Sequence, residues 1–198
     1  MDVWIETVIR QLILYSLPVL ISLTFVSFIE CKLIAKPAPH PFHAISWMGT
    51  WLPWIAAIFF SRAIIFALPQ PVESGKHAAL YRCLGHIILC ITGFFLYCWS
   101  LNHQPPTGLP PLHLWWAKIL MFFNLCMASM HLLPLPGMYA GELLLPRQML
   151  LYFMWGNSHR NVIIFTFLAA SPLTDWLLGG WVIFPIYEYL ANFSEAFR

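Results

Sequence analysis

Three ionisable residues, Glu30, His86 and His131, lie within or at the end of strongly apolar stretches of the sequence. Ionisable side chains at membrane depth are costly and usually functional, and a carboxylate with imidazoles can bind a metal ion or carry a proton. The alternative is a structural cluster in which Glu30 hydrogen-bonds His131 or another polar neighbour. No two histidines here lie one helical turn apart, so the sequence favours the structural cluster. In that cluster we expect Glu30 to be protonated or paired, within reach of a polar group on the His86 helix or the His131 turn.

The segment HLLPLPG, residues 131–137, interrupts the apolar sequence next to His131. Proline has no backbone N–H and pushes the preceding residue out of the helical region, so Pro134 and Pro136 predict an extended break. Beside membrane-length apolar sequence, such a break needs internal hydrogen-bond partners and is usually buried in protein or lines a cavity. We therefore expect the polar residues to be positioned around this turn.

Composition places these residues in a membrane protein. The chain has 198 residues, of which 60% are hydrophobic and 9% charged, and its mean hydropathy is +0.73. Soluble domains average about 25% charged residues. The net charge of +2 is scattered, which argues against nucleic acid as a partner. The five cysteines form no CxxC pair and are interpreted as packing residues.

The apolar pattern predicts an all-α, polytopic bundle of about five to six membrane segments, folded as one domain over residues 1–198. The apolar stretches are 9–34, 47–68, 78–101, 114–133, 138–155, 162–178 and 179–193. Pro53 and Arg62 interrupt the second stretch. An arginine facing lipid is costly, so this stretch is expected to form a re-entrant or interfacial hairpin, or to bury Arg62 against protein.

Positive charge predicts the orientation of the segments. The 102–113 loop has no lysine or arginine, whereas basic residues flank the other helix ends: Lys32, Lys36, Lys76, Arg82, Arg147 and Arg160. The positive-inside tendency then places this loop and the N-terminus outside. The first residues, MDVWIETVIRQ, lack the basic start of a signal peptide, so the first helix is expected to be retained. The expected location is the bacterial inner membrane.

Five short pieces, in order along the chain, resemble motifs of the site-2 protease family of intramembrane zinc metalloproteases. They are TFVSFIEC at 24–31, HPFHAISWMGTWLP at 40–53, LPQPV at 68–72, GHIIL at 85–89 and HLLPLPGMYAG at 131–141. The corresponding family motifs are TFHEFAHA, NPxxHIDPxGTLLLP, KPVPV, GPLAN and NLLPIPPLDG. The resemblance implies a helical membrane core whose helices surround an ancestral active site.

The same alignment implies that the catalytic residues are lost. Val26 and Glu30 stand at the positions of the family's two zinc-binding histidines, Ser27 at the general base, and Tyr139 at the aspartate ligand. Valine cannot bind a metal, and serine needs an activating partner to act as a base. Ser27 with His86 or His131 lacks the glycine-rich elbow and third acid of a serine hydrolase. The degenerate positions predict a pseudoenzyme without a cofactor.

The resemblance implies a non-catalytic accessory or scaffold subunit that holds a membrane segment of a larger membrane complex. The expected partners are other integral membrane subunits and lipid. The alternative is an intramembrane zinc metalloprotease, or a metal-binding protein, with relocated ligands Glu30, His86 and His131. Candidate partner-binding residues are aromatic side chains and loop prolines, which suit contact surfaces. They are Trp51, Trp54, Pro69, Pro71, Pro134 and Pro136.

Overall fold

The computed structural model describes residues 2–37, 40, 45, 47–68, 75–105, 109–146 and 158–196. Helices account for most of these residues. They are α1 (Asp2–Leu33), η2 (Trp47–Trp51), α2 (Leu52–Phe59), α3 (Lys76–Asn102), α4 (Leu112–Met130), α5 (Tyr139–Leu144), α7 (Ser158–Ala170), α8 (Pro172–Thr174), η3 (Asp175–Ile183) and α9 (Phe184–Glu195). The segments labelled η have π-helical hydrogen bonding.

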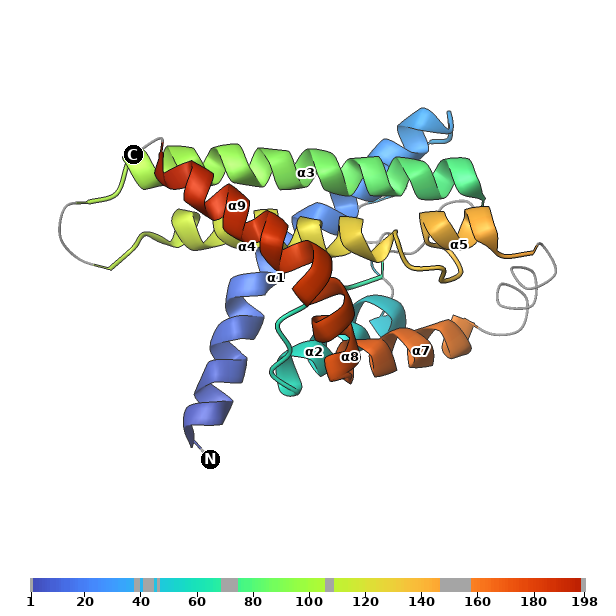
Figure 1. Cartoon of the computed structure of the whole chain (residues 1–198), viewed down its shortest axis with the longest axis horizontal. Helices are drawn as coiled ribbons and strands as arrows, with labels where there is room; N and C mark the ends of the chain where they lie inside the picture. The colour runs from blue at the N-terminus through green and yellow to red at the C-terminus, as the bar shows by residue number, and fades with distance from the viewer. Residues whose placement is uncertain are drawn as a thin grey trace.

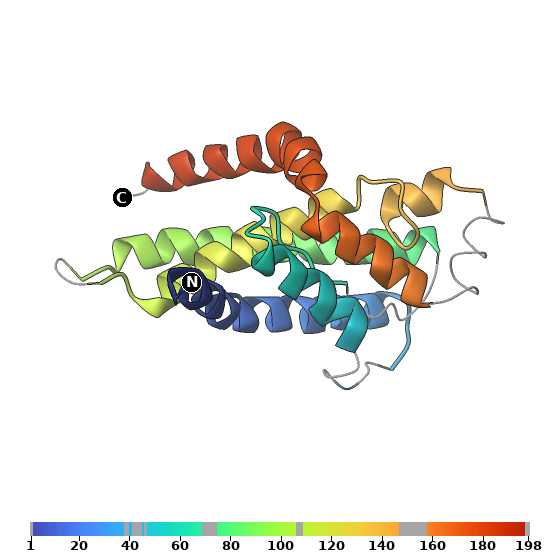
Figure 2. The same cartoon turned by 90° about the horizontal axis from the view of Figure 1, so that it is seen from below.

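Helices α3 and α4 lie side by side at the centre of the molecule (Figure 1). The close approach uses a glycine, because a Cβ atom on Gly93 would lie 2.6 Å from the backbone nitrogen of Met121. Helix α1 packs on one side of this pair, and α9 lies on the other (Figure 2). Helices α2 and α7 pack against each other beside this core.

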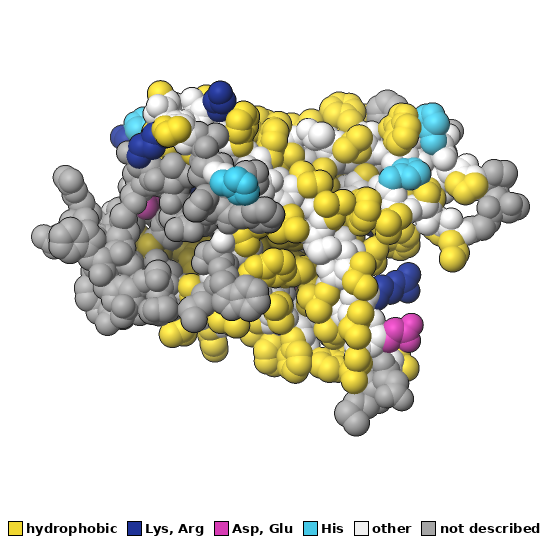
Figure 3. All heavy atoms as spheres, turned by 180° about the vertical axis from the view of Figure 1, so that it is seen from behind, with side chains coloured by type: hydrophobic (Ala, Val, Ile, Leu, Met, Phe, Trp, Pro, Cys, Tyr) yellow, Lys and Arg dark blue, Asp and Glu magenta, His cyan; other side chains and the backbone are white. Residues whose placement is uncertain are grey.

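Three helices, α1, α3 and α4, are long and apolar enough to cross a membrane. A fourth span is possible if α7 and the following helices count as one, although the chain bends there by 71°. Hydrophobic side chains also cover much of the outer face over α1 (Figure 3). An exposed stripe with a four-residue repeat runs along this helix: Ile5, Ile9, Ile13, Leu17, Ile21 and Phe25. These features confirm the expected helical, membrane-type architecture, with fewer spans among the described residues than the five to six segments predicted.

Residues 47–68 turn back on themselves, as the sequence predicted. After α2, Ser61 adopts a positive φ of 53°, and the chain returns in extended form. The two ends meet where the Leu68 N–H donates to the Gly49 carbonyl at 3.2 Å. The Thr50 hydroxyl also donates to the Leu68 carbonyl at 2.7 Å. The returning segment 64–67 is fully buried, so it forms part of the core.

The hairpin is joined to the C-terminal helices by a reciprocal pair of contacts, which we call the 62/175 clamp. Arg62 Nε donates to the carbonyl of Ala170, the last residue of α7, at 2.8 Å. In the other direction, the Asp175 carboxylate accepts the N–H groups of Ile64 at 3.0 Å and Ala63 at 3.4 Å. A cation at a helix C-terminus is favourable, and both charged side chains find partners inside the protein. Arg62 is therefore held against protein.

Three sequence-based boundaries were wrong, and prolines explain two of them. Helix α1 begins at Asp2, not at residue 9. The expected continuous segment 138–155 ends at α5, because Leu145 precedes Pro146 and takes an extended ψ of 138°. Residues 147–157 lie outside the described residues. The expected segment 162–178 breaks at Ser171, before Pro172, where the Ser171 hydroxyl caps α8 by accepting the Leu173 N–H at 3.2 Å.

Candidate functional site

A buried ion pair links α1, α3 and the turn after α4. Arg82 Nη1 donates to Glu30 Oε1 at 2.7 Å, and the two residues are 4% and 1% exposed. Arg82 Nη2 donates to the Gly137 carbonyl at 3.0 Å. A charge-assisted hydrogen bond of this kind compensates the cost of burying both ions. The prediction that Glu30 has a polar partner on the His86 helix is confirmed, with Arg82 as that partner instead of His131.

The turn between α4 and α5 satisfies its own backbone groups. The Ala140 N–H donates to the His131 carbonyl at 3.0 Å, and the Leu135 N–H donates to the Leu133 carbonyl at 2.8 Å. Gly137 has a φ of +81°, and its N–H donates to Glu142 Oε1 at 3.2 Å. This positive φ favours glycine and orients the carbonyl that Arg82 binds. The expected break with internal hydrogen-bond partners is confirmed, but it is built from consecutive tight turns instead of an extended segment.

A second chain of buried polar side chains connects α3, α4 and α1. His86 Nδ1 lies 2.8 Å from Asn124 Oδ1. The Asn124 amide nitrogen donates to Ser22 Oγ and to the Leu120 carbonyl, each at 2.8 Å. Asn124 therefore presents its oxygen to His86, so His86 carries a proton on Nδ1. His86 Nε2 is buried and has no hydrogen-bond partner among the described residues.

His131 follows the last residue of α4 and lies near His86, with the two ring centroids 6.2 Å apart. The Tyr139 N–H donates to His131 Nδ1 at 3.2 Å. Nδ1 is therefore the acceptor, and a neutral ring must carry its proton on Nε2. Burial, together with neighbouring His86 and Arg82, lowers the pKa of His131 to about 3. His131 is consequently neutral near pH 7.

The set Glu30, His86 and His131 does not fit a zinc site in this arrangement. The Glu30 carboxylate is bound to the Arg82 cation, which would repel a metal ion placed beside it. His131 offers no free lone pair, because Nδ1 accepts a hydrogen bond and Nε2 carries the proton. Within the described part of the chain, no three His, Cys, Asp or Glu residues are grouped to hold a metal ion. We derive no metal chemistry from this centre.

The positions at which the resemblance implies lost zinc ligands and a lost base, Val26, Ser27 and Tyr139, serve structural contacts. Val26 is fully buried, and a Cβ atom on Gly85 would lie 3.1 Å from Val26 Cγ2. Ser27 is buried, and its hydroxyl has no hydrogen-bond partner among the described residues. Neither His86 nor His131 therefore activates Ser27 as a nucleophile. Tyr139 begins α5 and contributes its backbone N–H to His131.

The partner-binding candidates differ in accessibility. Trp54 is only 3% exposed and packs in the core of the chain, so it offers no surface to a neighbour. Trp51 is half-buried, with its ring centroid 5.0 Å from that of Trp54. Pro134 is exposed and Pro136 half-buried on the turn. Pro69 and Pro71 lie outside the described residues.

The sequence analysis did not include Arg82 and Asn124 in the polar cluster, although their spacing from His86 and His131 indicated a shared helix face. Arg82 lies four residues before His86, so both project from the same face of α3. Asn124 lies seven residues before His131, which places it two turns away on the same face of α4. Arg82 was assigned to a helix end by its sequence position. Because each of them shares a helix face with one of the two histidines, both could have been predicted as members of the buried polar cluster.

No known protein family, curated protein or solved structure matches this chain. The resemblance to site-2 proteases therefore rests on the five short sequence pieces given above.

Proposed function

We propose that this chain is a pseudoprotease of the site-2 type that acts in a membrane as an accessory or scaffold subunit. The observation that carries the proposal is the position of the Arg82 guanidinium. It binds Glu30 on α1 and the Gly137 carbonyl on the turn, and it comes itself from α3. A fixed cation thus joins the elements that, by the resemblance, once shared a zinc ion. A permanent side-chain cation can hold these elements together but cannot activate a water molecule.

The lack of an activated nucleophile supports a non-catalytic role. Ser27 has no partner that could take its proton among the described residues, and Val26 has no polar atom to offer. His131 is held by the Tyr139 backbone as a neutral ring with its lone pair in use. These contacts suit a rigid polar core better than general acid–base chemistry, which needs a group that can exchange a proton with a substrate.

The proposed partner is a membrane segment of another subunit. The hairpin of residues 47–68 and the turn at 131–137 keep the backbone-shaping residues of the ancestral groove, including Thr50, Pro134 and Pro136. Trp51 and the exposed Pro134 offer accessible contact surface there. We further propose the bacterial inner membrane as the location, with the N-terminus outside.

The test is co-purification from native membranes in mild detergent, followed by mass spectrometry. We expect a defined membrane partner whose recovery falls several-fold in Trp51→Ala. The matched control is Trp181→Ala, which removes an indole that is 75% exposed on η3. Zinc content and cleavage of membrane peptides are measured on the same preparation. Stoichiometric zinc with peptide cleavage would establish the relocated-ligand protease instead, and a partner-free monomer in native membranes would refute the scaffold role.

A further inference from the structure

The tip of the 47–68 hairpin holds an arginine whose charged end has no acceptor among the described residues. Arg62 is half-buried, and its Nε donates to the Ala170 carbonyl at 2.8 Å. The Asp175 carboxylate accepts the two backbone N–H groups that follow Arg62, and within the described chain it forms no ion pair with the guanidinium. The terminal nitrogens of Arg62, Nη1 and Nη2, therefore keep their donors unused in the described part of the chain.

These donors lie deep along the membrane-spanning helices. The tip of the hairpin, where α2 ends, is level with the middle of α3 and away from both of its ends (Figures 1 and 2). Helix α3 has 27 residues, so its middle is about 20 Å from either end. A free arginine side chain can extend toward the headgroups, but Arg62 is tied through Nε to the last residue of α7. The acceptor has to reach the guanidinium at this depth.

The surroundings of Nη1 and Nη2 select the kind of acceptor. Exposed apolar side chains flank the tip, with Phe59 at 51%, Phe60 at 52% and Leu173 at 54%. Such a rim suits lipid tails or a membrane segment, and lipid tails offer no acceptor. The Nη1–Nη2 end of a guanidinium presents two parallel N–H donors, which match the two oxygens of a carboxylate or phosphate. Lipid phosphates lie at the ends of the spanning helices, so the group that fits at mid-depth is a carboxylate on another membrane segment.

We propose that Arg62 is the docking point for an aspartate or glutamate in a membrane segment of the partner subunit. The inference rests on the proposed scaffold role and specifies the chemistry of the partner, which carries a carboxylate near the middle of a membrane segment. The 62/175 clamp fixes the guanidinium in place before the partner arrives, because Nε is already bound. Asp175 weakens the attraction, since its negative charge lies beside the same tip.

Synthetic membrane peptides, reconstituted with the full chain in phosphatidylcholine vesicles, test this site. The probe is a poly-leucine helix of about 20 residues with one central glutamate, and its controls carry glutamine or leucine at that position. Energy transfer from the tryptophans of the protein to a dye on the peptide measures association. We expect the glutamate peptide to associate several-fold more tightly than both controls. Equal association of the glutamate and glutamine peptides, or no association of either, would overturn the proposal.

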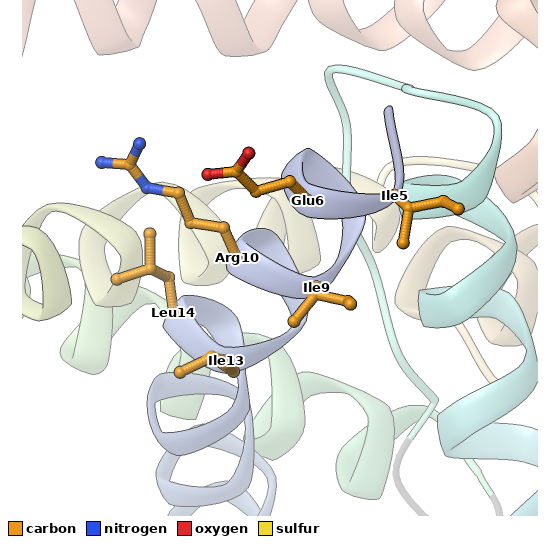
Figure 4. Close-up of a pocket in the computed structure, with 6 residues that line it drawn as sticks. All are labelled: Ile5, Glu6, Ile9, Arg10, Ile13 and Leu14. Atoms are coloured by element: carbon orange, nitrogen blue, oxygen red, sulfur yellow. The ribbon is translucent and has the colours of Figure 1, made fainter. Parts of the chain in front are cut away.

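Variants of the full chain place the contact at Arg62. Arg62→Lys keeps a cation but removes the paired donors, so it should weaken association of the glutamate peptide several-fold. Arg10→Lys is the matched control and should bind as the wild type does, because Glu6 lies beside Arg10 on α1 as a counter-charge (Figure 4). An Arg62→Lys variant that binds the glutamate peptide as well as this control would overturn the proposal.

Asp175→Asn distinguishes carboxylate binding from a purely structural role of the clamp. It keeps an acceptor for the Ile64 N–H and removes the neighbouring negative charge. Association of the glutamate peptide should therefore strengthen, and that of the glutamine peptide should not change. Loss of packing would weaken both, so weaker association of the glutamate peptide in this variant would count against the proposal.

Capture of the native partner separates this inference from the scaffold role. A partner whose recovery depends on Trp51, but whose membrane segments contain no aspartate or glutamate, would overturn the carboxylate contact and leave the scaffold role in place. A partner-free monomer in native membranes would refute the scaffold role and, with it, the assignment of Arg62 to a partner.

Discussion

Glu30 and Arg82 form a buried ion pair, with Oε1 and Nη1 2.7 Å apart, that ties α1 to α3. Removing one partner leaves the other as an uncompensated charge in a low-dielectric environment. We expect Arg82→Met to lower the free energy of unfolding by about 3–5 kcal/mol. Denaturant or thermal unfolding in a lipid-like detergent measures this change. The control is Lys76→Met, which removes an exposed positive charge at the start of the same helix.

The double variant Glu30→Met with Arg82→Met should be more stable than Arg82→Met alone, because no orphan charge remains. The single variant Glu30→Met completes the comparison. If the losses of unfolding free energy in Glu30→Met and Arg82→Met add up to the loss in the double variant, the two residues are not energetically coupled. An Arg82→Met variant as stable as the Lys76→Met control would contradict the central role given to this contact.

Asn124 connects His86 to Ser22 inside the bundle, with 2.8 Å contacts on both sides. Asn124→Leu should lower the free energy of unfolding by about 1–3 kcal/mol, since it leaves a buried donor on His86 without an acceptor. Asn102→Leu, at the exposed C-terminal end of α3, is the matched control. Equal unfolding free energies of the two variants would show that the hydrogen bonds of Asn124 do not stabilise the fold.

Gly93 sets the distance between α3 and α4. An alanine Cβ there would lie 2.6 Å from the Met121 backbone nitrogen, and backbone cannot move aside as a flexible side chain can. We expect Gly93→Ala to cost about 1–3 kcal/mol of unfolding free energy through overpacking. Gly180→Ala serves as the control, because a Cβ at that position meets no atom within 4 Å. Similar melting temperatures for both variants would argue against the tight α3–α4 contact.

His131 should make stability depend on pH. Its pKa is lowered from 6.5 to about 3 in the folded chain, mainly by burial. Between these pH values the unfolded chain binds a proton that the folded chain does not. The free energy of unfolding should therefore fall as pH decreases from 6.5 toward 3, by about 1.4 kcal/mol per pH unit for one proton.

His131→Gln keeps an acceptor for the Tyr139 N–H and should reduce this pH dependence. His113→Gln, which changes an exposed histidine in the first turn of α4, is the matched control. Urea unfolding at a series of pH values measures both slopes. A wild-type slope retained in His131→Gln would assign the pH dependence to other groups.

The sequence was sufficient for the helical class, the hairpin and the broken turn, because these depend on apolar run length and on proline chemistry. Pro134 and Pro136 interrupt a helix regardless of the tertiary structure around them, so the position of the break can be read from the sequence. The partner of Glu30 was harder to predict, since pairing across two helices depends on their rotation and crossing point. Arg82 lies near enough to its helix end to resemble a solvated charge. The end of α5 was missed for a simpler reason, which is that Pro146 was included in an apolar run.

The 62/175 clamp restricts when the hairpin of residues 47–68 can complete its folding during synthesis of the chain. Arg62 and the backbone of Ile64 find their partners 108 and 111 residues further along the chain. When the hairpin leaves the ribosome, those partners have not been synthesised, so its arginine and extended backbone cannot yet form these hydrogen bonds. The hairpin can reach its final packing only after α7 and Asp175 have been synthesised. Assembly of this protein therefore finishes with its C-terminal third, whatever the order in which its long helices are inserted.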